Sequence, residues 1–142
     1  MLLDPFPLRI AFLWCAWLLL MLFHVELGLM PLFHGCSVEI KSRVAATQLP
    51  RIFFAMLVYF LIPLAAMLLA IQGLAESESW TTSLLVRRLQ FWLAIVYSLT
   101  NIGHLIADMC IPDSRLDQVL LMAVLTIIGA LLCWQTFQWA HQ

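Results

Sequence analysis

Residues 52–71 read IFFAMLVYFLIPLAAMLLAI, a stretch without a single charged side chain. A helix rises about 1.5 Å per residue, so a helix of this length matches the roughly 30 Å hydrocarbon core of a bilayer. A helix also satisfies its backbone hydrogen bonds within its own segment, which lipid requires. The stretch therefore predicts a transmembrane helix, which we expect to extend from about Pro50 to Ile71.

Three further stretches have the same apolar character, and they run over about 8–30, 86–109 and 116–140. Their length and the lack of period-two alternation exclude strands. Short connections between long helices make consecutive helices antiparallel. The sequence therefore predicts an all-α integral membrane protein, a single domain over residues 1–142. We expect four transmembrane helices in an antiparallel up-down bundle, with both termini on the same side of the membrane.

The overall composition agrees with residence in a lipid bilayer. Hydrophobic residues make up 64% of the chain and charged residues 11%, against about 45–50% and about 25% in soluble proteins. A soluble domain of this size could not hide so much apolar surface. The net charge of −1 provides no basic surface, which excludes nucleic acid as a partner. We expect a multi-pass protein of a bacterial inner or internal membrane.

The predicted topology gives the molecule two different ends. All six tryptophans fall in the half that holds both termini and the connection between the second and third spans, namely Trp14, Trp17, Trp80, Trp92, Trp134 and Trp139. Tryptophan prefers the membrane interface, which supports the number of spans. We name this half the tryptophan end and the other half the histidine end. Basic residues are similar in number at both ends, so the positive-inside rule does not decide which end is cytoplasmic.

The longest connection lies at the histidine end. Its residues Ser37–Gln48 alternate apolar and charged side chains, which favours either a short interfacial amphipathic helix or an ordinary solvated linker. Cys36 and Cys110 both follow predicted helix ends on this side. A disulfide between them is geometrically feasible, and the sequence leaves open whether they are bonded.

Ionisable side chains within a membrane are costly and therefore indicate a functional site. His24 lies six positions before Met30, and His104 lies five before Met109. At about 1.5 Å per residue both rings are expected roughly 8–9 Å inside the same boundary. Asp108 follows His104 by one helical turn and shares its face. The sequence therefore predicts that the two histidines face each other if the first and third helices are neighbours.

Three hypotheses account for this group. In the first, the polar side chains fix helix packing through hydrogen bonds to one another. Alternatively they hold a transition metal or a haem, because imidazole suits zinc, iron and copper. The metal candidates are His24, Glu26, His34, His104 and Asp108, and the cofactor candidates are His24 and His104. The third hypothesis is acid–base catalysis, with His104, Asp108 and Glu26 as candidate catalytic residues. Glu26 is two positions from His24, so a regular helix turns it about 200° away.

The expected function follows mainly from what the sequence lacks. It contains no soluble domain and no complete catalytic signature, which favours an accessory or assembly subunit of a larger membrane complex. Other membrane protein subunits or a second copy are then the expected partners, besides lipid. The alternative is a metal- or haem-binding membrane protein, or an enzyme on a lipid or isoprenoid substrate, that uses the His/carboxylate cluster at one membrane face. The sequence leaves open whether the protein is an enzyme.

Overall fold

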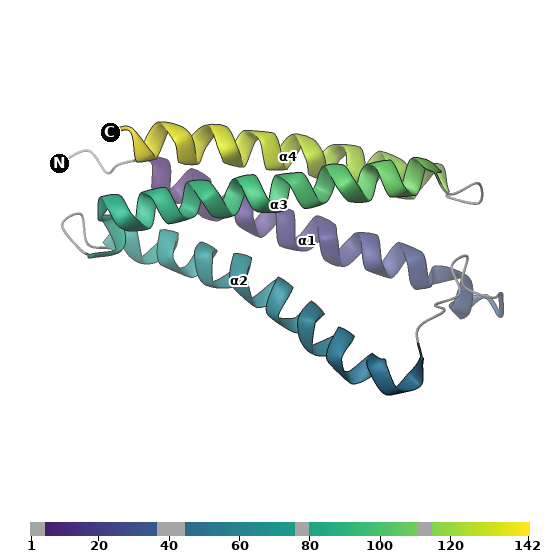
Figure 1. Ribbon diagram of the computed structural model, residues 1–142. Helices are drawn as coiled ribbons and strands as arrows, with labels where there is room; N and C mark the ends of the chain where they lie inside the picture. The colour runs from purple at the N-terminus through teal and green to yellow at the C-terminus, as the bar shows by residue number, and fades with distance from the viewer. Residues whose placement is uncertain (1–4, 37–44, 76–79, 111–114) are drawn as a thin grey trace.

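The computed structural model describes residues 5–36, 45–75, 80–110 and 115–142. It confirms the predicted fold: four long apolar helices pack antiparallel, and each is long enough to span a membrane. They are α1 (Pro5–Phe33), α2 (Leu49–Ala75), α3 (Leu84–Cys110) and α4 (Leu116–Ala140), shown in Figure 1. Two short 3-10 turns, η1 (Ala46–Gln48) and η2 (Trp80–Thr82), precede α2 and α3. The protein is therefore an integral multi-pass membrane protein.

Helix α1 continues beyond the predicted end near Pro31. Proline at this position removes only its own N–H, so the helix runs on to Phe33. It ends at Gly35, whose φ of 71° lies in the left-handed region. There the N–H of Gly35 donates to Leu32 O at 3.2 Å and that of Cys36 donates to Pro31 O at 2.9 Å. This is the Schellman arrangement that closes many helices, so the glycine, rather than the proline, ends α1.

The proposed interfacial helix over Ser37–Gln48 falls mostly on residues 37–44, which lie outside the described part of the chain. The described remainder contains only the turn η1.

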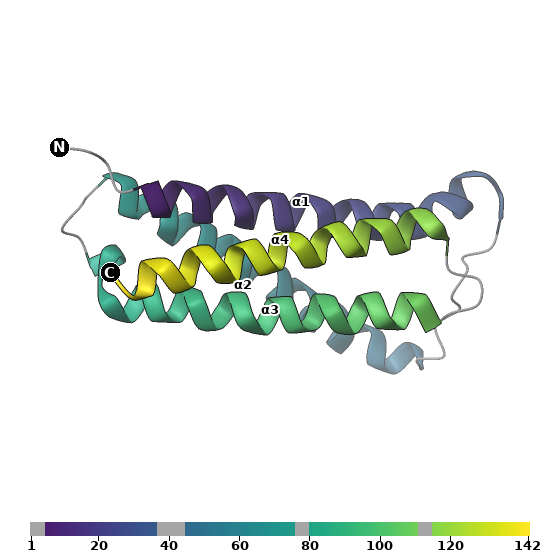
Figure 2. The same cartoon turned by 90° about the horizontal axis from the view of Figure 1, so that it is seen from above.

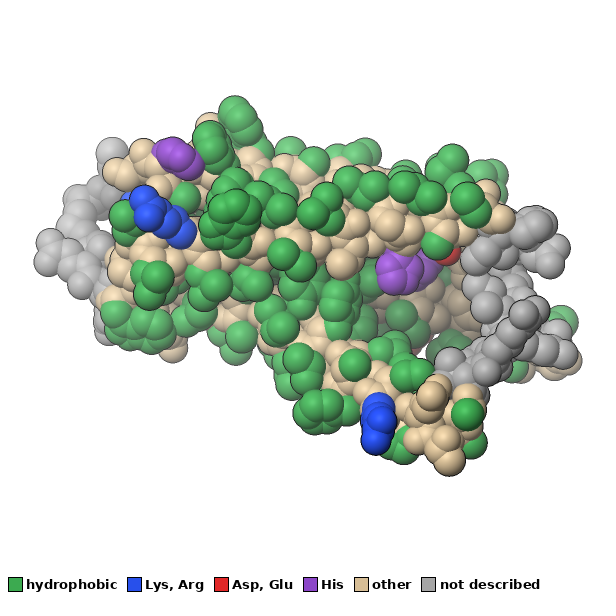
Figure 3. Space-filling model, in the orientation of Figure 1, with side chains coloured by type: hydrophobic (Ala, Val, Ile, Leu, Met, Phe, Trp, Pro, Cys, Tyr) green, Lys and Arg blue, Asp and Glu red, His purple; other side chains and the backbone are tan. Residues whose placement is uncertain are grey.

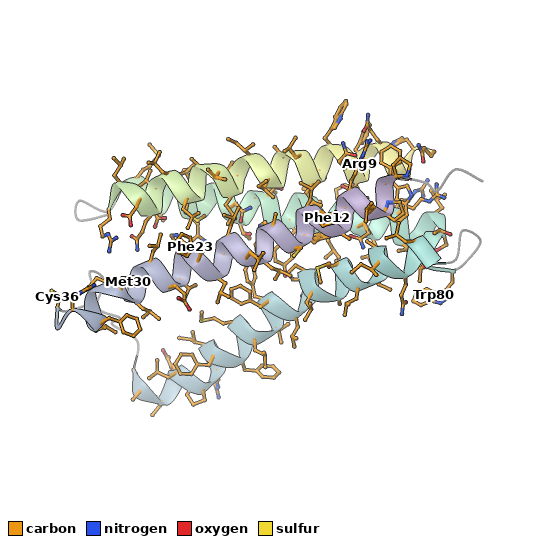
Figure 4. The ribbon with its side chains drawn as sticks, turned by 180° about the vertical axis from the view of Figure 1, so that it is seen from behind. Arg9, Phe12, Phe23, Met30, Cys36 and Trp80 are labelled. Atoms are coloured by element: carbon orange, nitrogen blue, oxygen red, sulfur yellow. The ribbon has the colours of Figure 1, made fainter. Side chains whose placement is uncertain are left out.

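The two ends of the bundle are easily told apart in Figure 4, where Arg9 and Trp80 lie at the tryptophan end and Met30 and Cys36 lie at the histidine end.

Three helices form a layer that the fourth crosses. Helix α4 lies between α1 and α3 and packs against both, while α2 packs on α1. Figure 2 shows α1, α4 and α3 side by side, with α2 passing obliquely beneath them. Helix α2 is close to the layer at the tryptophan end and diverges from it toward the histidine end (Figure 1). The divergence leaves one side of the bundle open at the histidine end.

The core lies at the tryptophan end. Trp14, Trp17 and Trp139 are fully buried. The indole N–H of Trp14 donates to Gln90 Oε1 at 2.9 Å, and that of Trp17 donates to Asn101 Oδ1 at 3.2 Å. The other three tryptophans, Trp80, Trp92 and Trp134, are exposed, as expected for interfacial residues. The interfacial interpretation stays a prediction for these three exposed tryptophans, while the other three belong to the buried core.

A polar stripe runs along α3 on the face turned toward the other helices. Its members are three or four residues apart, the spacing of one helix face: the polar residues Gln90, Tyr97, Asn101, His104 and Asp108, with the small Ala94 between the first two. All of them except His104 are buried. The Gln90 amide also donates to Ala66 O at 2.7 Å. The face that His104 and Asp108 were predicted to share is therefore part of a stripe that spans most of the helix, from Gln90 to Asp108.

Pro63 divides α2 into two halves with different packing. In the inner half, Pro63–Ala75, the buried residues Pro63, Ala66, Ala70 and Gly73 form one face against the bundle. In the outer half, Leu49–Ile62, every residue from 50 to 58 is exposed. The inner half is thus a packed helix, and the outer half is the part that diverges from the layer.

Candidate functional site

The histidine end brings three of the five candidate residues together. His24 Nε2 on α1 lies 3.8 Å from Asp108 Oδ2 on α3. The rings of His24 and His104 have centroids 6.4 Å apart and are nearly perpendicular, at 84°. The prediction that α1 and α3 bring the two histidines to the same depth, facing each other, is confirmed.

The cluster is incompletely hydrogen bonded. A separation of 3.8 Å between His24 and Asp108 is an electrostatic contact that is too long for a hydrogen bond. Among the described residues, neither His24 Nδ1 nor Asp108 Oδ2 has a hydrogen-bond partner, although both atoms are buried. A buried polar atom without a partner costs about 1–3 kcal/mol. These two atoms lack the hydrogen bonds that the packing hypothesis expects, and the choice among the three hypotheses stays a prediction.

The structure does not bring the other two candidates to this cluster. Glu26 is exposed, as a regular α1 requires for a residue two positions from His24. His34 lies in the turn after α1, exposed, where its carbonyl oxygen accepts from the Cys36 thiol at 3.8 Å. Within the described ranges, no group of three or more His, Cys, Asp or Glu side chains could hold a metal ion. A metal or haem held by His24 and His104 stays a prediction.

An apolar cavity of about 480 Å³ opens beside the cluster, between α1, α2 and α3. In Figure 3, histidine side chains and an acidic side chain lie at the margin of the hollow left by the divergence of α2. The cavity is lined by residues that are mostly apolar or aromatic: Met21, His24, Val25, Ile52, Ala55, Met56, Tyr59, Phe60 and His104. Its polar groups are thus two imidazoles and one phenol.

A second hollow of about 400 Å³ lies on the α3 side of α2. It is lined by Tyr59, Thr100, Gly103, His104 and Ala107, so that Tyr59 and His104 belong to both spaces. The Tyr59 hydroxyl shares a hydrogen bond with Thr100 Oγ1 of α3 at 2.8 Å. His104 is exposed and is therefore the ionisable side chain most accessible to a molecule in either space.

Sequence reasoning found the histidines of this site and missed the contribution of α2. Five of the lining residues belong to its outer half, which reads as continuous apolar sequence. The one available signal was Pro63, since a proline inside a helix often marks a bend. Cys36 and Cys110 are both free and exposed in the structure.

Chemically, the arrangement can bind the polar end of an apolar molecule and exchange a proton with it. His104 can donate or accept a hydrogen bond through its ring nitrogens. The His24 ring lies beside the His104 ring and has the Asp108 carboxylate 3.8 Å from its Nε2 atom. A comparison of the chain with protein-family models, with curated proteins and with solved structures finds no match.

Proposed function

We propose that the protein binds a lipid-soluble small molecule in the cavity between α1, α2 and α3. The observation that carries this proposal is the cavity itself, with its volume of about 480 Å³ and an apolar wall interrupted by His24, His104 and Tyr59. Ligand sites typically measure about 300–1,000 Å³ and combine a hydrophobic wall with a few polar groups that orient the ligand. The cavity meets both criteria.

The position of His104 indicates what the ligand must carry. An exposed imidazole within a membrane has no water to bond, and a polar group without a partner in an apolar medium is costly. A ligand with a hydroxyl or carbonyl oxygen at one end satisfies that ring, while its apolar part lies against Met21, Met56 and Phe60. An isoprenoid or long-chain alcohol has this chemistry. Catalysis on such a molecule, with His104 exchanging a proton, is a further prediction of the same site.

Photoaffinity labelling in nanodiscs tests the binding proposal. The probe is a diazirine analogue of farnesol, an isoprenoid alcohol, and a diazirine phospholipid reports on bulk lipid contact. We expect the farnesol probe to label the lining segments 21–25 and 52–60 selectively, and unlabelled farnesol to compete. Labelling spread evenly over all exposed helix faces, without competition, would contradict the proposal.

Two matched variants sharpen this test. Ala55→Trp places a large ring in the cavity wall, whereas Leu61→Trp adds one on an exposed position of α2 outside the lining. We expect Ala55→Trp to lose most of the competed labelling and Leu61→Trp to retain it. Equal labelling of both variants would show that the probe lies elsewhere.

A second candidate function, that of an accessory or assembly subunit, is supported by the outer half of α2. Large apolar side chains such as Phe53, Phe54 and Leu57 are more than half exposed there, and helix faces of this kind also serve as contact surfaces within membranes. Native mass measurement in mild detergents tests this candidate. If the protein is such a subunit, we expect complexes heavier than the single chain. Free monomer under all conditions would contradict this candidate function.

A further inference from the structure

The hydrogen-bond ladder of α2 is interrupted at Pro63. Proline has no N–H to donate to the carbonyl four residues earlier, and its ring crowds that carbonyl. Here the carbonyl is that of Tyr59, and the Tyr97 hydroxyl of α3 donates to it at 2.7 Å. Lipid offers no water for this purpose, so a neighbouring helix must satisfy the freed group. The bond from Tyr97 therefore joins α2 to α3 at the level where the backbone hydrogen bonding of α2 is interrupted.

The packing of α2 changes at the same level. On the inner side, Ala66 and Ala70 are buried, and Ala66 O accepts a hydrogen bond from Gln90. On the outer side, residues 50–58 are all exposed. Among the interactions of the described helices, no hydrogen bond or ion pair joins these outer residues to α1, α3 or α4. Among the described residues, the hydrogen bonds from the outer half to another helix are thus confined to Tyr59, one turn before Pro63.

The outer half nevertheless presents a regular packing face to the cavity. Its lining residues Ile52, Ala55, Met56, Tyr59 and Phe60 have the spacing i, i+3, i+4, i+7 and i+8. This is the stripe by which a helix packs against a neighbour. Opposite it, Met21 and Val25 of α1 are four residues apart and line the same cavity. The cavity therefore separates the Ile52–Met56 part of this face from α1, whereas Tyr59 and Phe60 already lie against Trp17 of α1.

We infer that the outer half of α2 is a lateral gate that pivots at Pro63, with the Tyr97–Tyr59 bond as its fixed point. The gate closes by bringing the Ile52–Met56 part of this face onto α1, and it opens to admit a ligand directly from the lipid. Because lipid chains are as apolar as the helix, no hydrophobic driving force holds the gate in either position. The inference rests on the proposed function, since it assigns the gate to that cavity.

Distance measurements between spin labels in nanodiscs test the gate. The native cysteines are replaced by serine or alanine, and new cysteines report on each half of α2. The outer pair is Phe53→Cys with Ile106→Cys, and the inner control pair is Leu68→Cys with Leu89→Cys; all four positions are exposed. We expect two distance populations for the outer pair, separated by about 5 Å, half the width of a helix. We expect one narrow population for the inner pair.

Farnesol then separates the gate from the binding proposal. If farnesol shifts the distances of the outer pair toward one population and leaves those of the inner pair unchanged, the result supports both the gate and the binding proposal. A single outer distance that farnesol leaves unchanged, while the photoprobe still labels the cavity, overturns the gate and leaves binding intact. Two outer populations together with failed labelling support the pivot and overturn the proposed ligand class.

Backbone variants test the pivot itself. Pro63→Ala restores the missing N–H, and we expect it to merge the two outer populations into one. Tyr97→Phe removes the donor to Tyr59 O and is expected to broaden the outer distances. Tyr59→Phe is the matched control, because it removes the bond to Thr100 and leaves the carbonyl bond in place. If Pro63→Ala keeps both populations in folded protein, the pivot is not at Pro63.

Discussion

The tryptophan end and the histidine end are built from the same helices and differ in how their polar groups are satisfied. At the tryptophan end, the buried indoles of Trp14 and Trp17 donate to side chains of α3. At the histidine end, two buried atoms of the His24–Asp108 pair have no hydrogen-bond partner among the described residues, and a cavity lies beside them. The buried Gln135 Oε1 near the tryptophan end has no partner either. The difference between the ends therefore lies in the buried aromatic core at the tryptophan end and the cavity at the histidine end.

The largest expected effect is the loss of a buried indole at the tryptophan end. Trp17→Ala removes a fully buried ring that contacts Tyr59, Phe60 and Tyr97. It also leaves Asn101 Oδ1 without its donor. We expect a loss of about 3–5 kcal/mol in the free energy of unfolding, measured by denaturant titration in detergent. Trp92→Ala, at an exposed position, is the control and should cost less than about 0.5 kcal/mol. Similar losses for both would remove the distinction between core and interfacial tryptophans.

A smaller effect is expected from adding one methyl group to glycine at two places in the bundle. A Cβ at Gly129 would lie 2.7 Å from Ser98 Oγ, whereas one at Gly103 would meet nothing within 4 Å. We expect Gly129→Ala to lower the free energy of unfolding by about 1–3 kcal/mol through overpacking. Gly103→Ala, beside the second hollow, should instead raise it by about 0.5–1 kcal/mol, because alanine favours the helix. Thermal unfolding of both variants gives the comparison, and equal shifts would contradict the open histidine end.

The smallest effect on stability is expected from substitutions in the candidate site at the histidine end. The double variant His24→Leu with Asp108→Leu removes both unsatisfied groups, and replacing a polar pair by apolar side chains is often nearly neutral. We expect its free energy of unfolding to stay within about 1 kcal/mol of the natural protein, while competed photolabelling by the farnesol probe falls several-fold. A strongly destabilised double variant would show that the pair is needed for packing and would favour the first of the three hypotheses.

Much of the fold could be predicted because apolar runs of this length have one stable form in lipid. Counting positions from the helix ends was enough to bring His24 and His104 to one level, and the helical repeat was enough to turn Glu26 away from them. The end of α1 was misplaced because a local signal, Pro31, was weighed above the left-handed Gly35. The two burial classes of tryptophan could not be separated either, since the partners of Trp14 and Trp17 lie on α3, far along the chain.

The divergence of α2 could not be predicted either, and the reason differs from the one that applies to the tryptophans. In a soluble helix, polar residues mark the side that faces water, and the packed face follows from the pattern. Residues 52–71 are apolar on every side, because lipid and protein interiors favour the same side chains. The pattern therefore does not distinguish the inner half, which packs, from the outer half, which does not. The cavity depends on that distinction and so becomes visible only in the structure.

The polar stripe of α3 has a consequence for the order in which hydrogen-bonded helices are made. Helix α3 has a mean hydropathy of 1.3, the lowest of the four spans. Gln90, Tyr97 and Asn101 each bond an atom of α1 or α2, and both helices precede α3 in the chain. Proteins are synthesised from the N-terminus, so the earlier helices are made first. The least apolar span is therefore synthesised after the two helices that hold its hydrogen-bond partners.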